Sequence, residues 1–333
     1  MSNYYILTET LKTKKMARNS LNRITFSLFL TILTNLISCD NYDEGTVVVG
    51  FPTTPSISAT QYLTNLPFGG KGSTKILIRN QGSPSPEILS LWLCGIPADG
   101  AGANNATDWT NADGTWDYTK KPQVEGNVIW NGEFKMTLDG KGNRTLTGNG
   151  LPSHPTGIFP ITPGSIPYKY DRNPNIITVQ PLGITFPAVP LEAASRSCVG
   201  FGPAGYSLTG IAIYHGASTL GNDAAAHEML DRFGGHTDGT KRYHYHFPSQ
   251  DLQDHISKHS SGHSALMGYM LDGFGIYGPY GEKGELLFSK DLDESHGHKH
   301  PVLWDGQMVN IYHYHWTYDF PYNIGSYKGT PVK

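Results

Sequence analysis

The chain has 333 residues, a formal net charge of −3 and only 16% charged residues. No dense block of Lys and Arg follows residue 23, which excludes nucleic acid as a partner because phosphate binding needs concentrated positive charge. Glycine (39) and proline (22) are abundant. This composition favours a mainly β protein, a β-sandwich or barrel-like sheet with long Gly/Pro-rich loops and one or two short helices.

Residues 1–39 have the pattern of a lipoprotein signal peptide. Basic residues between 12 and 23 precede an apolar run, 24–38, that is too short to cross a membrane. The run ends in Leu36-Ile37-Ser38-Cys39, which resembles a bacterial lipobox, where the cysteine is acylated. We therefore predict lipidation at Cys39 and attachment to a membrane through the N-terminal lipid. The expected location is the cell envelope of a Gram-negative bacterium, as an outer-membrane or surface lipoprotein; plain secretion is the alternative.

The rest of the chain is predicted to form a flexible tether, residues 40–60, and a single large β-rich domain, residues 61–333. Outside the cytoplasm Cys94 and Cys198 can oxidise to a disulfide, although two separate buried thiols fit the sequence equally well. Within the domain, residues 134–138 and 145–147 are predicted strands, joined by the Gly-rich hairpin turn 139–143.

Two segments before the histidine-rich region carry further expectations. Residues 99–118 read as a long loop, in which Trp109 and Trp116 either pin the loop or form a surface on which a glycan stacks. Residues 224–232 are predicted to be a helix, because they are rich in good helix formers. Asn222 or Asp223 supplies the N-cap, and Gly234-Gly235 supplies the stop.

The sequence Tyr-His-Tyr-His occurs twice, at residues 243–246 and 312–315. We call each copy of this motif a word. Alternate side chains of a strand point to opposite faces, so each word is predicted to place its two histidines on one face and its two tyrosines on the other. Two imidazoles at that spacing can reach one metal ion. The sequences that flank the two words differ too much to establish an internal duplication.

Thirteen of the fourteen histidines lie between residues 215 and 315, and imidazole is both a common metal ligand and a general acid or base near neutral pH. We predict a transition metal ion, Zn or Cu, bound through a cluster of histidines and carboxylates. The two words converge on a shared ion if their strands are neighbours. Glu228 and Asp293 are the candidate general bases for a metal-bound water. The candidate metal ligands are His227, His236, His244, His246, His263, His296, His298, His313 and His315.

The chain resembles the YHYH-domain family of bacterial secreted and membrane-anchored proteins, over residues of about 148–329. The resemblance is carried by the two words together with segments 149–154, 226–228, 235–236, 263–266, 271–278, 291–294, 296–298 and 321–322. It implies an extracytoplasmic protein and no particular reaction. Members of the family often carry cysteines where this chain has Ser295 and Ser326, so a disulfide there would be lost unless serine hydrogen bonds replace it.

Two functions follow from these observations. The first is a metal-dependent hydrolase or oxidoreductase that acts on a small-molecule ligand. The second is a non-catalytic surface module that binds a glycan or a protein, in which tyrosines pack on one sheet face and histidines bond to carboxylates on the other. Asp272, Asp291 and Asp293 are the available carboxylates for that network.

Overall fold

The computed structural model describes residues 62–67, 69, 88–95, 108–219 and 221–333. The chain divides into residues 1–55 and 56–333, and every described residue belongs to the second unit. The predicted signal peptide, the tether and Cys39 therefore lie outside the described residues. Among the residues that are described, no helix is long and apolar enough to cross a membrane.

The expected mainly β fold is confirmed. Two α-helices occur in the described part of the chain, α2 (Ala224–His227) and α3 (Gln250–Ile256). Single 3₁₀ turns are η1 (Tyr118–Lys120), η2 (Pro167–Lys169) and η3 (Ser289–Asp291). The strands are β1 (Leu66–Pro67), β2 (Thr115–Trp116), β3 (Phe134–Leu138), β4 (Asn143–Gly148), β5 (Leu182–Pro187), β6 (Glu192–Ser197), β7 (Pro203–Ser207), β8 (Ala212–Tyr214), β9 (Gly235–Thr237), β10 (Tyr243–Tyr245), β11 (Leu266–Met270), β12 (Gly275–Tyr277), β13 (Gly297–Trp304), β14 (Gln307–His315) and β15 (Tyr327–Gly329).

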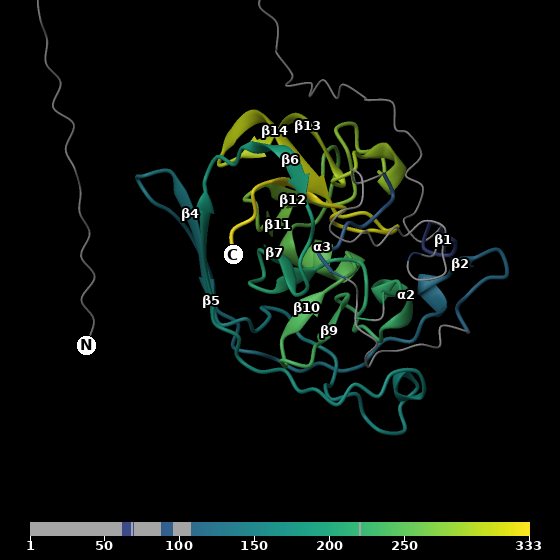
Figure 1. Ribbon diagram of the computed structural model, residues 1–333. Coiled ribbons are helices and arrows are strands. Elements are labelled where there is room, and N and C mark those ends of the chain that lie inside the picture. The colour runs from purple at the N-terminus through teal and green to yellow at the C-terminus, as the bar shows by residue number, and fades with distance from the viewer. Residues whose placement is uncertain (1–61, 68, 70–87, 96–107, 220) are drawn as a thin grey trace, which may run out of the picture. The chain divides into compact units, whose positions relative to one another are not determined.

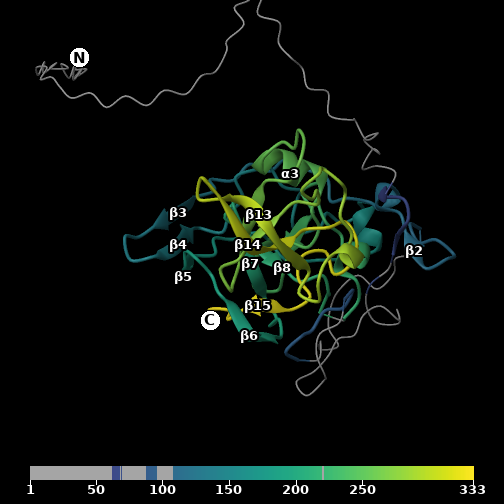
Figure 2. The same cartoon turned by 90° about the horizontal axis from the view of Figure 1, so that it is seen from above.

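The centre of the molecule is an eight-stranded sheet with the order β13-β14-β12-β11-β7-β8-β10-β9. In Figure 1, β13 and β14 lie at one end of this sheet and β10 and β9 at the other. Smaller sheets are formed by β1-β2, β6-β15 and β3-β4-β5, and Figure 2 shows the last two beside the main sheet. The predicted hairpin is present, because β3 pairs antiparallel with β4 across the turn at 139–142.

The main sheet consists of two halves whose equivalent strands are arranged in mirror order, and each half is one copy of an internal repeat. Residues 203–246 form β7-β8-β10-β9, and residues 266–315 form β11-β12-β14-β13 with the same pairings. The repeats meet where β7 pairs antiparallel with β11, with Tyr206 opposite Tyr269. Equivalent residues thus face each other at the centre of the sheet, which places an approximate two-fold axis between these tyrosines.

The repeat is also visible in the sequences of the two central hairpins. Residues 205–214 read GYSLTGIAIY and residues 268–277 read GYMLDGFGIY. Gly210 and Gly273 occupy the same turn position with φ of 82° and 88°, a backbone conformation that favours glycine. The structure therefore establishes the duplication that the flanks of the two Tyr-His-Tyr-His words left undecided.

The predicted helix 224–232 is wrong in extent, because α2 ends at His227. Asp223 is its N-cap and accepts a hydrogen bond from the Ala226 backbone N–H, as expected. Glu228 then adopts an extended conformation, with φ −84° and ψ 142°. Asp231 instead accepts hydrogen bonds from the Gly157 backbone N–H and the Tyr243 hydroxyl, so tertiary contacts override the local helix propensity.

Two open questions from the sequence are settled by the structure. Cys94 and Cys198 form a disulfide, next to a bridge between Leu93 and Val199. Trp109 and Trp116 are buried, with exposed fractions of 1% and 0%, so they pin the loop and offer no surface for a glycan.

Candidate metal centres

The two Tyr-His-Tyr-His strands, β10 and β14, separate tyrosines from histidines as predicted. Tyr314 donates a hydrogen bond to Asp272 at 2.6 Å, and Tyr312 donates one to Asp293 at 2.8 Å. Asp272 and Asp293 therefore serve the tyrosine face. The expectation that these two carboxylates would bond to histidines is wrong.

The tyrosines of β10 are held in the same way. Tyr243 donates a hydrogen bond to Asp231. Asp231 is the repeat counterpart of Asp293, because Asp231 accepts from the backbone N–H of Gly235, the first residue of β9, as Asp293 accepts from that of Gly297, the first residue of β13. Tyr245 lies 2.9 Å from the Thr209 hydroxyl. The tyrosine face is thus a buried hydrogen-bonded network, and the histidines need another explanation.

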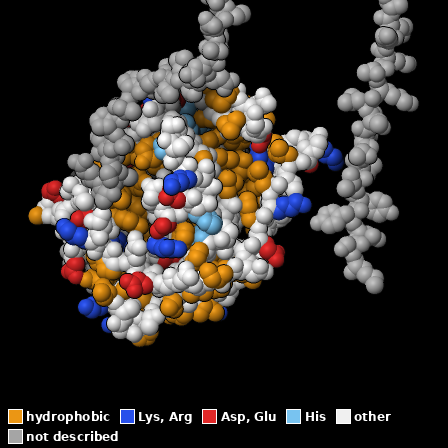
Figure 3. Space-filling view, turned by 180° about the vertical axis from the view of Figure 1, so that it is seen from behind, with side chains coloured by type: hydrophobic (Ala, Val, Ile, Leu, Met, Phe, Trp, Pro, Cys, Tyr) orange, Lys and Arg blue, Asp and Glu red, His pale blue; other side chains and the backbone are white. Residues whose placement is uncertain are grey.

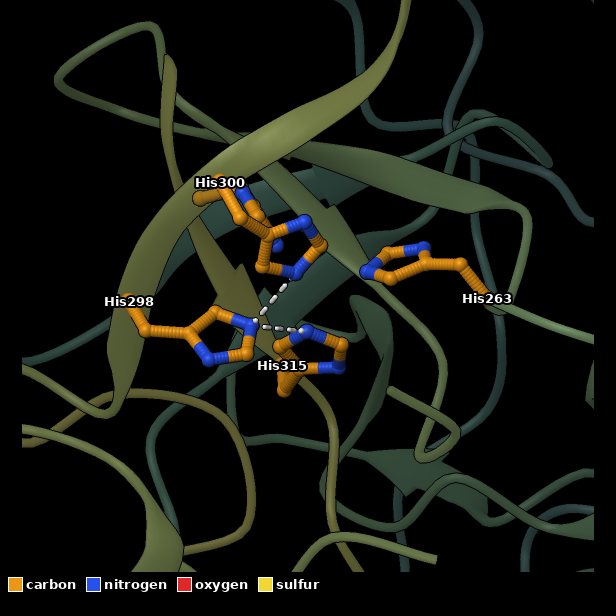
Figure 4. A group of neighbouring side chains, drawn as sticks. His263, His298, His300 and His315 are labelled. Atoms are coloured by element: carbon orange, nitrogen blue, oxygen red, sulfur yellow. Dashed lines mark hydrogen bonds between the residues drawn. The ribbon is translucent and has the colours of Figure 1, made fainter. Parts of the chain in front are cut away.

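Five histidines gather at the β13–β14 end of the sheet, and we call them the outer cluster. His313 and His315 come from β14, and the remaining members come from β13 and from the segment that precedes β11; Figure 4 labels every member except His313. His298 lies opposite His313 in the β13–β14 ladder, so their side chains share one face. Each residue offers one ligand atom within 4.8 Å of all the others. The members are His263, His298, His300, His313 and His315.

Hydrogen bonds at Nδ1 fix the ring orientation of four members of the outer cluster. Nδ1 of His315 lies 2.6 Å from the carbonyl oxygen of Gly278, and Nδ1 of His313 lies 3.1 Å from that of Ile311. His263 and His300 contact the carbonyls of the residues that follow them, at 2.8 and 3.0 Å. A carbonyl oxygen only accepts, so each of these Nδ1 atoms carries the proton and each neutral ring keeps a lone pair on Nε2.

The Nε2 atoms of the outer cluster converge on one point. Nε2 of His298 lies 3.0 Å from Nε2 of both His300 and His315. The Nε2 atoms of His263 and His313 are buried and have no hydrogen-bond partner. A metal with bonds of about 2.0–2.1 Å holds adjacent nitrogens about 2.9–3.4 Å apart, at angles of about 90–110°. The separations therefore match adjacent ligands of one ion.

Three members of the outer cluster, His298, His313 and His315, are neutral at pH 7 in the metal-free form. Burial, reinforced by the neighbouring His298, lowers the pKa of His313 to about 2. Burial also lowers the pKa of His298 to about 4 and holds the pKa of His315 well below its usual value. Neutral imidazole is the form that binds metal, so no bound proton has to leave.

An open pocket of about 620 Å³ adjoins the outer cluster. His298 and His300 line it, together with Lys299 and the carboxylates of Glu282, Glu285 and Asp291. Oε1 of Glu282 also lies 2.9 Å from Nδ1 of His300, so one pocket carboxylate orients a ring of the cluster. Histidine side chains reach the surface among charged side chains on the face in Figure 3.

Three histidines at the other end of the sheet form what we call the inner cluster: His236, His244 and His246. His236 lies on β9 opposite His244 on β10. Nε2 of His244 is 3.1 Å from Nε2 of His246, while their Nδ1 atoms contact the carbonyls of Arg242 and His215. All three side chains are buried, with exposed fractions between 2% and 5%.

Glu228 extends toward the inner cluster from the end of α2. Its Oε2 is 2.7 Å from Nε2 of His236 and 3.5 Å from Nε2 of His246. The closer contact is an ion pair without hydrogen-bond alignment, since neither ring nitrogen of His236 has a hydrogen-bond partner. Burial would raise the pKa of Glu228, but His236, His246 and Lys121 together outweigh burial and lower that pKa to about 2. Glu228 is thus a carboxylate at neutral pH.

Three residues of the predicted site lie outside both clusters. Nδ1 of His227 contacts the carbonyl of Asp223 on α2. His296 has φ of 76°, because it occupies the turn position that Gly234 fills in the first repeat. Its Nε2 is hydrogen-bonded to the Thr317 hydroxyl. Asp293 bonds to Tyr312 and forms ion pairs at 3.1 and 3.3 Å with two basic side chains.

His300 belongs to the outer cluster but was not among the predicted metal ligands. Strand β13 begins at Gly297 and places His298 and His300 on one face. The spacing His298-x-His300 is the same period-two signal that identified the Tyr-His-Tyr-His words, and it would have found this residue.

The two clusters are separate sites. Strands β12, β11, β7 and β8 lie between β14 and β10. Five strand spacings of about 4.8 Å put the clusters roughly 24 Å apart along the sheet. A single ion shared by both words is therefore excluded.

Ser295 and Ser326, which stand where family members often carry cysteines, are joined by a hydrogen bond instead of a disulfide. Oγ of Ser295 lies 2.9 Å from Oγ of Ser326, and Nε of Arg196 donates to Ser295 at 2.9 Å. Arg196 also pairs with Glu294 at 2.7 Å. These hydrogen bonds and the ion pair thus hold in place the segment that precedes β13.

Residues 165–286 match the family described as YHYH protein, which confirms the predicted resemblance to the YHYH-domain family. The match includes the first Tyr-His-Tyr-His word and the inner cluster, and it is shorter than the expected 148–329. No curated protein and no solved structure matches the chain.

Proposed function

We propose that the chain, which belongs to the YHYH family through residues 165–286, binds a transition metal ion at the outer cluster. One observation carries this proposal. Four of the five rings have Nδ1 committed to a carbonyl oxygen, so their Nε2 lone pairs face one another in a buried space. Two of these Nε2 atoms, those of His263 and His313, are buried without a hydrogen-bond partner, and a cation bound among the rings would satisfy them.

Copper and zinc fit the donor set best. The ligand atoms that converge in the outer cluster come from imidazole only among the described residues. Imidazole suits both metals, and a given nitrogen site binds Cu²⁺ more tightly than Zn²⁺. We therefore propose that both ions bind and that copper binds more tightly.

The acidic pocket supports chemistry at the exposed side of this centre. Three pocket carboxylates, those of Glu282, Glu285 and Asp291, attract cations and raise the local concentration of an incoming metal ion. A small-molecule substrate would enter through the same opening. A bound metal would supply water activation for hydrolysis, and copper would add one-electron chemistry. We thus retain the metal-dependent hydrolase or oxidoreductase as the proposed reaction class.

The proposal is tested by the metal content of the full chain, purified in detergent without a histidine tag and stripped with a chelator. Copper and zinc are titrated back, and the bound metal is counted by mass spectrometry. We expect His313→Ala and His300→Ala each to weaken or remove one equivalent of metal. His313 tests the buried centre, and His300 tests the rim.

His259→Ala is the matched control. His259 lies in the segment before β11, stacks on Tyr280 with ring centroids 4.1 Å apart and belongs to neither cluster. It should keep the wild-type metal content. Equal metal binding by the control and both cluster variants would refute the proposal.

We further propose that the protein is extracytoplasmic and lipid-anchored through Cys39. The disulfide between Cys94 and Cys198 supports an oxidising compartment. Labelled palmitate should be incorporated by the wild-type chain and not by Cys39→Ala. Equal incorporation by both would contradict lipidation at this residue.

A further inference from the structure

The inner cluster is not used by the proposed function. Its three histidines and Glu228 are all buried, with exposed fractions between 2% and 6%. A buried charge or ring nitrogen without a partner is costly unless something compensates it. Both ring nitrogens of His236 are buried without a hydrogen-bond partner.

The internal repeat gives each inner histidine a counterpart in the outer cluster. The cross-strand pair His236–His244 corresponds to His298–His313. His246 corresponds to His315, because Tyr245 and Tyr314 pair with equivalent residues of β8 and β12.

The hydrogen bonds at Nδ1 repeat as well. Nδ1 of His246 donates to the carbonyl of His215 at 2.8 Å, and Nδ1 of His315 donates to the carbonyl of Gly278 at 2.6 Å. These carbonyls follow β8 and β12 in the same way. Nδ1 of His244 contacts the carbonyl two residues before it, as His313 does. Duplication has therefore copied both the ligand atoms and the groups that orient them.

The groups that accompany the three equivalent histidines differ between the two ends of the sheet. The outer cluster adds His263 and His300, whereas the inner cluster has the carboxylate of Glu228. The extended conformation of Glu228 after α2 brings its Oε2 to 2.7 and 3.5 Å from two of the ring nitrogens. These separations are close to those of adjacent ligands on an ion with bonds of about 2.0–2.1 Å.

We propose that His236, His244, His246 and Glu228 form a second metal centre, closed to solvent, that binds Zn²⁺ in a four-coordinate structural site. Three imidazoles and one carboxylate are a donor set that suits the tetrahedral geometry of structural zinc. The site joins β9, β10 and the end of α2. Bound zinc therefore stabilises this half of the sheet and exchanges slowly, whereas the outer centre exchanges quickly through its pocket.

The inference does not depend on metal binding at the outer cluster, and zinc loading of separate variants distinguishes the two. The probe is Zn²⁺ alone, added to the chelator-stripped full chain. Wild type should bind two equivalents, one released slowly to a chromophoric chelator and one released quickly. His313→Ala should retain the slow equivalent, and His244→Ala should retain the fast one. Co²⁺ loaded into His313→Ala should give the intense visible bands of a tetrahedral site.

Glu228→Gln covers the case in which His244→Ala fails to fold. It keeps the shape of the side chain and removes the charge, so the slow equivalent should be released at least about tenfold faster. Glu125→Gln, at an exposed glutamate, is the matched control and should leave both equivalents unchanged. Loss of all zinc from His313→Ala, or wild-type release from Glu228→Gln, would overturn the second centre. A wild-type chain that holds only the slow equivalent would instead refute the outer site alone.

Discussion

The separation of tyrosines from histidines on β14 predicts that Tyr314→Phe destabilises the fold and spares metal binding. The Tyr314 hydroxyl donates to Asp272 at 2.6 Å and accepts from the Lys328 backbone N–H at 2.8 Å. The side chains of Tyr314 and Asp272 are both buried. The substitution removes one hydrogen bond to a carboxylate and leaves one N–H without its acceptor.

The magnitude follows from these two losses. A hydrogen bond to a charged group contributes about 1.5–3 kcal/mol, and a buried N–H left unsatisfied costs about 1–3 kcal/mol. Some relaxation is expected, so we predict a loss of about 3 kcal/mol in the free energy of unfolding. Burial raises the pKa of Asp272 to about 6, and the tyrosine hydrogen bond opposes that rise. The loss should therefore be larger at pH 8, where Asp272 is charged, than at pH 5.

Urea denaturation of the metal-free protein at the two pH values measures this effect, and metal titration of the same variant measures binding. Tyr206→Phe is the control. Tyr206 is half-buried, and among the described contacts its hydroxyl makes no hydrogen bond. A Tyr314→Phe protein with wild-type stability, or one that loses its metal, would refute the division of labour between the two faces.

Three further predictions concern acid and cross-links. Burial lowers the pKa of His154 and of His215 to about 4 and that of His313 to about 2. In the metal-free protein the folded state therefore keeps these three histidines neutral, while the unfolded chain binds protons below pH 6.5, and each histidine should cost about 2 kcal/mol of stability at pH 5; an unchanged urea midpoint of the metal-free protein between pH 7.5 and pH 5 would contradict this. Ser295→Cys combined with Ser326→Cys should form a disulfide and raise the thermal midpoint, since the two Oγ atoms lie 2.9 Å apart; free thiols in the oxidised double variant would count against it. Replacing both Cys94 and Cys198 by serine should destabilise the protein by about 4–5 kcal/mol in the chain-entropy model, since the bridge closes a loop of sequence separation 104; a stability equal to wild type would refute this estimate.

Local patterns predicted the strands and the chemistry of their faces. Period-two alternation identified β10 and β14, and it assigned their tyrosines and histidines to opposite faces. The hairpin β3–β4 followed from its turn residues in the same way. These features depend on neighbours in the chain, so the sequence alone contains them.

Features that depend on distant contacts were not predictable in this way. Four strands separate β14 from β10, and no local signal states the order of strands in a sheet. The Ala-rich segment of α2 stops early because Glu228 and Asp231 have partners in β9 and the loop before it. The duplication was obscured because β13 and β14 form a much longer hairpin than β9 and β10, which shifts the second word relative to its repeat.

Anomalous diffraction from crystals of the copper-loaded protein tests the central claim most directly. Data collected on both sides of the copper absorption edge locate the ion without any assumption about its ligands. We predict a strong peak among the Nε2 atoms of His298, His313 and His315, about 2.0–2.1 Å from each. Copper peaks confined to surface carboxylates, with none among these three rings, would contradict it.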